Sequence, residues 1–229
     1  MFRISVVVPV FRPQLFYNMI DSIYSNTTLP NKIVVVNNSS EALTIKSKGH
    51  VHIELHDFGK NIYPYAAWEI GRHRANKCDA VLFINDDILL ASNFFERITH
   101  TFQKYPTAGV ISPKTEIDMS LFHNYKPQDS IEEVKRREGW AFTIRKPLLD
   151  QISPIPSGLK LFYGDNYFWH WTYYLLYKWY RDLGTVCFHH VGASVKTTKN
   201  KKEFMEREKQ ICTDALQAQK VSGKGRREK

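Results

Sequence analysis

Two adjacent carboxylates, Asp86 and Asp87, follow an apolar run, Ala80–Ile84, and a single asparagine, Asn85. Neighbouring carboxylates at the end of an apolar segment repel each other and lose hydration. A divalent cation removes that penalty, and hard oxygen ligands suit Mg²⁺ or Mn²⁺, which also hold diphosphate groups. Asp and Asn also favour turns and helix caps. The pattern therefore predicts a metal site, with a polar turn as the alternative.

A histidine pair, His189–His190, follows a second short apolar run, Thr185–Phe188. Imidazole is a common ligand for Mn²⁺-like metals and a common contact for diphosphates. Further along, Gly192 allows close backbone approach and Ser194 offers a hydroxyl to phosphate. The segment is a candidate metal and phosphate site, although a histidine here can equally be structural.

A third carboxylate, Asp165, lies among aromatic residues in the segment Phe162–Tyr167. A carboxylate acts as a general base when the fold brings it to an acceptor hydroxyl. Aromatic faces suit sugar rings, which present apolar C–H surfaces. Aspartate is also a favoured N-cap, and a helix is expected to begin near Asn166. Both roles are compatible with this position.

The elements that must hold these side chains alternate along the first half of the chain. Runs of β-branched apolar residues are typical of strands buried on both faces. Proline is tolerated at the first helical position, and apolar residues recur at helical spacing after Pro13 and Pro64. In order, we expect strand 4–8, helix 13–24, strand 33–36, strand 51–55, helix 64–76, strand 80–84 and helix 94–102.

This alternation predicts the α/β class, with one Rossmann-like domain whose mostly parallel central sheet is flanked by helices. In such sheets, ligands bind beyond the carboxyl ends of the strands. Polar residues follow two of the expected strands, at Asn37–Ser40 and at Asn85–Asp87. We therefore expect a pocket where these two segments meet.

The second half of the chain is less regular in pattern. Residues 140–144 and 185–188 are expected to form strands, and the aromatic segment 166–182 is expected to be helical. A C-terminal helix is expected over residues 199–220, followed by a frayed or linker-like end.

Length and composition limit the class of protein. The 229 residues, of which 43% are hydrophobic, suit one folded domain. No run of about 18 apolar residues is present, and the first residues lack the pattern of a signal peptide. The three cysteines are scattered and odd in number, which fits a reducing compartment. We therefore expect a cytoplasmic location.

The net charge of +9 would suit a nucleic-acid partner, but its distribution argues against one. Residues 196–229 carry 11 Lys and Arg against 5 Asp and Glu, so most of the excess is in this segment. Nucleic-acid binding needs a basic face interleaved with stacking aromatics. We expect no nucleic-acid partner; the basic tail fits a solvated helix, a linker or a peripheral membrane contact.

Taken together, these segments resemble the GT-A glycosyltransferases of family 2 from about Ile4 to Ser194. The resemblance rests on an ordered set of short motifs, with the rhamnosyltransferase-like members closest in motif. The segments are Val6–Phe11, Ile33–Ser39, Asn61 with Ala66 or Ala67 and Gly71, the D-x-D-like Asn85–Asp87, Gly139–Arg145, Gly164–Asp165 and His189–Ser194.

The resemblance implies an enzyme that moves a sugar from a UDP-, GDP- or dTDP-linked donor to a glycan or lipid-linked acceptor, with inversion. It implies a GT-A domain over residues 1–195, divided into a nucleotide-binding half (1–112) and an acceptor half (113–195), and a basic helical tail (196–229). The implied nucleotide-binding residues are Pro9, Val10, Phe11, Arg12, Asn37, Asn38, Ser39, Asn61, Asn85 and Asp86.

The same resemblance implies the reaction chemistry. Mn²⁺ or Mg²⁺ would be held by Asp87, with Asp86 and His189, and Asp165 would be the catalytic base. The residues implied for the acceptor or the diphosphate are Trp140, Arg145, His190 and Ser194.

The chain departs from the family pattern at Asn37, Asn85 and Gly164, where the family usually has acidic residues. These changes motivate an alternative, a non-catalytic module that binds nucleotide sugars or carbohydrate. A sugar-phosphate nucleotidylyltransferase would need a glycine-rich phosphate loop after the first strand. The segment Pro9–Pro13 has no glycine, which disfavours that class.

Overall fold

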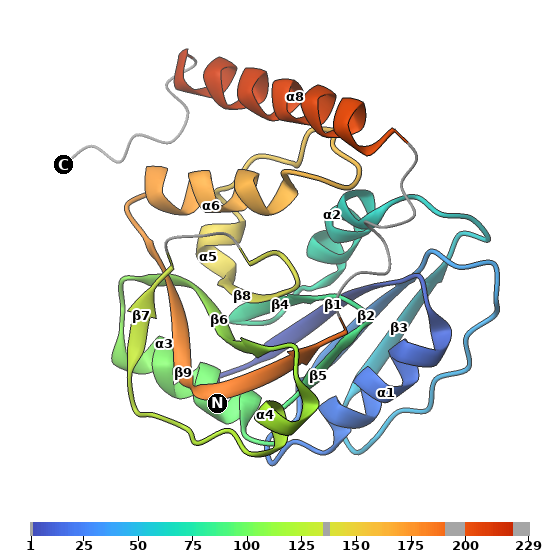
Figure 1. The fold of residues 1–229 in the computed structure, drawn as a ribbon, viewed down its shortest axis with the longest axis vertical. Helices are drawn as coiled ribbons and strands as arrows, with labels where there is room; N and C mark the ends of the chain where they lie inside the picture. The colour runs from blue at the N-terminus through green and yellow to red at the C-terminus, as the bar shows by residue number, and fades with distance from the viewer. Residues whose placement is uncertain (1, 135–137, 191–199, 222–229) are drawn as a thin grey trace.

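The computed structural model describes residues 2–134, 138–190 and 200–221, and Figure 1 shows their arrangement. Strands and helices alternate through the first half, as expected. The elements are β1 (Ile4–Val10), α1 (Pro13–Tyr24), β2 (Lys32–Asn37), β3 (His52–Asp57), α2 (Pro64–Arg74), β4 (Ala80–Ile84), β5 (Ile88–Leu90), α3 (Phe94–Lys104), β6 (Ala108–Glu116), α4 (Met119–His123), β7 (Ile131–Glu133), β8 (Ala141–Arg145), α5 (Lys146–Leu149), α6 (Gly164–Tyr174), β9 (Lys178–His189) and α8 (Lys201–Val221).

The strands of the described residues form one sheet in the order β3-β2-β1-β4-β8-β6-β9-β5, and β7 pairs with β9 off this path. β3, β2, β1 and β4 are parallel, as predicted. β8 runs antiparallel to β4 and β6, whereas β9 is parallel to β6 and antiparallel to β5 and β7. The complete sheet is therefore mixed. The sheet continues across residue 112, the predicted boundary between the nucleotide-binding and acceptor halves, because β6 spans that residue.

Helices cover both faces of the sheet, as expected from the apolar strands. Val6 and Val8 of β1 face a core built with α1 and α3. Val7, between them, faces a second core built with α2, α5 and α6. Figure 1 shows these two helical layers on opposite sides of the sheet. Successive side chains of a strand point to opposite faces, so a strand buried on both sides must be apolar throughout.

The second half differs from the prediction in several places. The expected helix over 166–182 ends at Tyr174, and β9 begins at Lys178. The aromatic content does not distinguish the two states, because Trp and Tyr are common in buried strands as well as in buried helices. Strands β5, β6 and β7 and the short helices α4 and α5 were not predicted.

The C-terminal helix α8 confirms the expectation of a helix over 199–220 within one or two residues of its ends. It lies across α6 rather than apart from the domain (Figure 1). Cys212 and Glu208 are buried, and Ile211 and Leu216 pack against the α2–α6 core. Among the described helices, none combines the length and hydropathy needed to cross a membrane.

The approach of α2 to β1 depends on Gly71. A Cβ atom added there would lie 2.1 Å from Cγ1 of Val7, which is fully buried. Helix propensity alone predicts that Gly71→Ala stabilises the protein by about 1 kcal/mol. We predict the opposite, a loss of about 1–3 kcal/mol, because overpacking forces the helix off the strand.

Urea unfolding of Gly71→Ala and wild type measures this difference. The control is Ala66→Gly at an exposed position of the same helix, which should cost only the propensity difference. A Gly71→Ala protein as stable as wild type would contradict this account of the packing.

Candidate active site

The carboxyl ends of β1 and β4 meet at Asp86. This side chain is only 3% exposed, and its Oδ2 accepts hydrogen bonds from the backbone N–H groups of Phe11 (2.6 Å) and Arg12 (2.7 Å). The Arg12 guanidinium donates to Oδ1 at 2.8 Å. Burial raises the pKa of Asp86, and Arg12 and the two N–H groups only partly oppose that shift. Asp86 therefore ties the loop after β1 to the end of β4.

Asp87 has a different environment although it is the next residue. Its Oδ2 lies 2.8 Å from Nη2 of Arg12 and 3.5 Å from Nε2 of His189. Its Oδ1 is buried and has no hydrogen-bond partner among the described residues. Burial alone would raise the pKa of Asp87, but His189 and Arg12 outweigh it and hold the pKa below the usual range. Asp87 is thus an ionised carboxylate with one uncommitted oxygen.

His189 is placed beside Asp87 by the pairing of β9 with β5, in which it lies opposite Ile88. Its ring stacks on Trp140 with the ring centres 5.3 Å apart. The indole N–H of Trp140 donates to Oγ1 of Thr115 at 2.8 Å, which fixes the plane of the indole. Trp140 therefore orients His189 toward the carboxylate.

Asp165 reaches the same edge of the sheet from the first turn of α6. A Cβ atom added to Gly139 would lie 2.8 Å from Cβ and 3.0 Å from Oδ2 of Asp165, so the two residues are in contact. The carbonyl of the next residue, Trp140, accepts a hydrogen bond from Asn85 N–H at 2.9 Å. Because Asn85 is two residues from Asp87, the predicted base and the predicted metal ligand lie on one edge of the fold.

The polar residues after β2 lie at the same carboxyl-terminal edge of the sheet. Asn37 is fully buried, and its side chain bonds to Glu41 O, Asp57 and Ser39, which shapes the loop. Asn38 accepts from Ile62 N–H at 3.3 Å, while its buried Nδ2 has no partner among the described residues. Asn38 therefore offers an unused donor next to the carboxyl ends of the strands.

The remaining predicted nucleotide residues lie on the same side. Pro9 and Val10 are buried at the end of β1, and their side chains belong to the strand rather than to a surface. Asn61 closes a turn by accepting from Tyr63 N–H at 2.7 Å in the loop before α2. The β1 loop, the β2 loop and the β4 end are thus brought together, as the sequence predicts.

Three residues predicted for the acceptor or diphosphate have different outcomes. Arg145 is not brought to the site: it lies opposite Ala80 at the far end of β8, and its guanidinium donates to the carbonyls of Phe102, Ala108 and Tyr105. This corrects the expectation, because β8 runs antiparallel to β4. His190 lies at the site, where its backbone N–H donates to the backbone carbonyl of Asp87 at 3.0 Å. Ser194 lies outside the described residues.

A divalent cation fits this cluster in part. Among the described residues, no three His, Cys, Asp or Glu side chains converge on one metal-sized point. Of the predicted metal ligands Asp87, Asp86 and His189, Asp86 is bonded to Arg12 and to backbone N–H groups, and the set as a whole stays a prediction. Asp87 Oδ1 and the imidazole of His189 remain as two suitable ligands, and Mg²⁺ characteristically takes few protein ligands and fills its sphere with phosphate oxygens.

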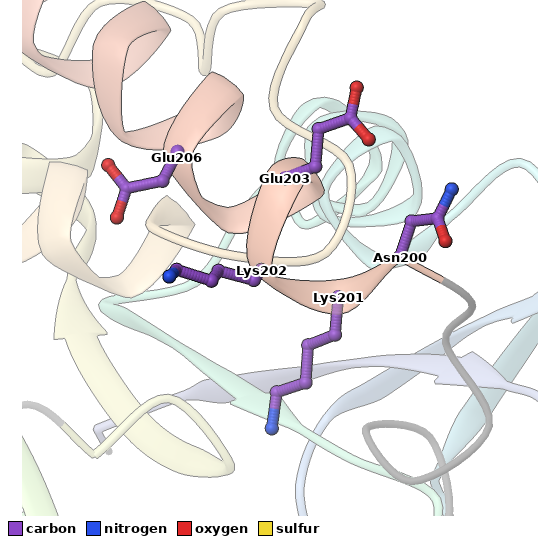
Figure 2. A pocket seen from close by; sticks show the side chains of 5 residues that line it. All are labelled: Asn200, Lys201, Lys202, Glu203 and Glu206. Carbon is purple, nitrogen blue, oxygen red and sulfur yellow. The ribbon is translucent and has the colours of Figure 1, made fainter.

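A shallow hollow of about 580 Å³ lies beside the first turn of α8. Figure 2 shows its lining, which combines the opposite charges of Lys201, Lys202, Glu203 and Glu206 with Asn200. Because two lysines and two glutamates line it, the hollow has little net charge to attract a diphosphate. The strand ends are the better candidate for a donor.

The sequence analysis did not assign Thr115 or the contact between Gly139 and Asp165. Thr115 lies on β6, a strand that was not predicted, so no pattern connected it to Trp140. Gly139 was part of the family motif, but only the structure shows that its missing side chain makes room for Asp165.

Comparison with known proteins agrees with this architecture. The similar solved structures include GalNAc-T7 with UDP, GalNAc and Mn²⁺, at 12% identity and a TM-score of 0.65, covering 82% of this chain and 43% of that one. They also include S. aureus TarS 1–349 in complex with UDP-GlcNAc, at 14% identity and a TM-score of 0.67, covering 94% of this chain and 67% of that one. A second TarS 1–349 structure covers 84% of this chain and 59% of that one, at 15% identity and a TM-score of 0.56.

At these identities, the likeness establishes the fold, and this chain spans roughly half to two thirds of the length of those proteins. No curated protein sequence matches the chain. Residues 5–171 match the protein family described as Glycosyl transferase family 2, which is well over half of the chain. With a GT-A fold and this match, the chain belongs to glycosyl transferase family 2.

Proposed function

We propose that the protein is a glycosyltransferase that moves a sugar from a nucleotide-diphosphate donor to an acceptor hydroxyl. The observation that carries this proposal is the placement of Asp87 and Asp165 on one edge of the sheet, with Asp87 Oδ1 buried and unpaired among the described residues. A carboxylate for a metal and a carboxylate for a proton are the two groups that the reaction needs. The family membership supports the same assignment.

On the donor side, the nucleotide would lie against the loops after β1 and β2, where the Asn38 amide nitrogen has no acceptor within the described part of the chain. Asp87 and His189 would hold Mg²⁺ or Mn²⁺, and the bound ion would supply Lewis-acid stabilisation of the departing diphosphate. Arg12 contacts both Asp86 and Asp87, and together with His189 it holds the pKa of Asp87 below its usual range. His190 follows directly after the last residue of β9, next to His189.

On the acceptor side, Asp165 would remove the proton from the attacking hydroxyl. The acceptor oxygen forms a bond to the anomeric carbon while the bond from that carbon to the diphosphate oxygen breaks. The electron pair leaves with the nucleoside diphosphate, and the proton ends on the carboxylate of Asp165. One displacement of this kind inverts the anomeric configuration.

The similar structures contain UDP, UDP-GlcNAc and, in one case, Mn²⁺, which favours a UDP-linked donor and a divalent cation for this chain. A GDP- or dTDP-linked donor, a glycan or lipid-linked acceptor, and a peripheral membrane contact through the basic end of the chain remain part of the proposal. The cytoplasmic location stays a prediction from the sequence.

One observation favours the second candidate, a non-catalytic module that binds nucleotide sugars or carbohydrate. Arg12 already pairs with both Asp86 and Asp87, with contacts of 2.8 Å to each. A carboxylate pair whose charge is partly balanced without a metal could bind sugar without turning it over. Donor binding without product release would identify this candidate.

Binding of a nucleotide donor should raise the melting temperature only when a divalent cation is present, since ligands that bind the native state stabilise it by mass action. Thermal shift with UDP-, GDP- and dTDP-sugars, each with and without Mn²⁺, measures this effect. We expect Asp87→Asn to lose the Mn²⁺-dependent shift. Asp150→Asn, at an exposed carboxylate on the far side of the fold, is the control and should keep it. No shift with any nucleotide would contradict the proposal.

Asp165→Asn should lower nucleotide release from the donor by about 100- to 10,000-fold, the usual contribution of general acid–base catalysis. The substitution keeps the size of the side chain, so the affinity for the nucleotide should stay close to that of wild type. Steady-state release assays and nucleotide titrations separate the two effects. Near-normal release by Asp165→Asn would rule out Asp165 as the base.

A further inference from the structure

Glu208 is the most deeply buried acidic residue of α8, with 1% of its surface exposed. Its Oε1 accepts the backbone N–H of Lys160 at 2.8 Å, and its Oε2 accepts those of Leu161 at 3.1 Å and Phe162 at 2.7 Å. Three successive N–H groups thus converge on one carboxylate. Among the described residues, no Lys, Arg or His forms an ion pair with Glu208.

The Glu208 carboxylate binds residues 160–162, which lead directly to the proposed base, Asp165. Phe162 also packs on Phe204 of α8, with the ring centres 6.0 Å apart. From the opposite side, the Tyr65 hydroxyl of α2 donates to Leu161 O at 3.1 Å. The segment 160–162 is therefore held between α8 and α2, three residues before Asp165.

The turn that follows has an unusual backbone. Tyr163 has φ 67° and ψ 3°, the left-handed region that residues other than glycine rarely adopt. Gly164 then passes so close to Tyr65 that an added Cβ atom would lie 2.4 Å from the ring. Such conformations persist only where the surroundings enforce them, and they concentrate at functional sites. Glu208 bonds to residues 160–162, the segment that leads directly into this turn.

Attachment of a helix to a domain does not require a buried charge. Ile211 and Leu216 already pack α8 against the core, and a buried carboxylate is costly to desolvate. Hydrogen bonds from three successive N–H groups, in contrast, fix the orientation and the position of the backbone segment that donates them. The contacts of Glu208 therefore fit a positional role better than a purely adhesive one.

We propose that Glu208 is a positioning residue, which acts through the 160–162 segment to hold the Tyr163–Asp165 turn and so place the Asp165 carboxylate. The inference rests on the proposed glycosyltransferase function of Asp165. It makes α8 a part of the active site's support, although the sequence suggested a solvated basic tail. Shortening or neutralising the carboxylate should then impair turnover more than donor binding.

The test compares wild type with Glu208→Gln, Glu208→Asp and Glu208→Ala. Nucleotide release is measured with the donor of the UDP-, GDP- and dTDP-sugar panel that wild type turns over fastest, and Mn²⁺-dependent binding of the free nucleotide is titrated in parallel. Glu206→Gln, at an exposed position two residues away, is the matched control. Rates are expressed per nucleotide-binding site, so that loss of folded protein does not count as loss of catalysis.

We expect Glu208→Gln to lower kcat by roughly 100-fold, the scale of a 1 Å misplacement of a reacting group. The nucleotide Kd should stay close to that of wild type, and Glu208→Asp, which keeps the charge, should recover part of the rate. Glu206→Gln should match wild type. Where Glu208→Ala does not fold, the two conservative variants carry the test.

Two results would overturn the inference. A kcat for Glu208→Gln equal to wild type per binding site would show that Glu208 only stabilises the fold. A parallel loss of nucleotide binding and turnover would show a general disturbance of the site. Failure of the proposed function is recognised separately, because wild type itself would then release no nucleotide from any donor, and the inference would fall with it.

Discussion

A pair of adjacent, buried carboxylates that share one guanidinium is the constraint on which this structure depends. Asp86 and Asp87 are 3% and 4% exposed, and Arg12 contacts both at 2.8 Å. Two such charges are costly to bury unless they are paired and hydrogen-bonded. The loop after β1 meets this need by supplying two N–H groups and the Arg12 side chain. These contacts satisfy Asp86 but leave Asp87 Oδ1 without a partner among the described residues. This oxygen is therefore the candidate metal ligand.

The second half of the chain brings the other reactive groups to that edge by close packing. Trp140 lies directly before β8, where its carbonyl accepts from Asn85 N–H, and its ring stacks on His189. Gly139 has no side chain, and only for that reason can Asp165 approach. The turn before Asp165 is held between α2 and α8. In the proposed function, the donor side therefore depends on the parallel half of the sheet, and the acceptor side depends on contacts between segments that are far apart in sequence.

Much of the parallel half could be predicted from the sequence, because a strand buried on both faces is a nearly continuous apolar run, as in β1 and β2. The topology of a parallel sheet then places the polar residues that follow those strands at one common edge. The antiparallel half could not be predicted in the same way, since a strand pattern does not report the direction of the strand. Arg145 illustrates this: the predicted strand 140–144 ends one residue before it, and β8, which contains it, runs away from the site. Glu208 illustrates another limit, because its partners are backbone N–H groups 46 to 48 residues away.

A crystal structure of the full chain with Mg²⁺ and UDP tests the central claim most directly, since it locates the cation and the nucleotide together. The account predicts the ion coordinated by Asp87 Oδ1 and by diphosphate oxygens, with the nucleotide between the β1 and β2 loops and Asp86 still bound to Arg12. A nucleotide bound elsewhere, or an edge in which Arg12 covers Asp87 and no ion reaches it, would contradict the account.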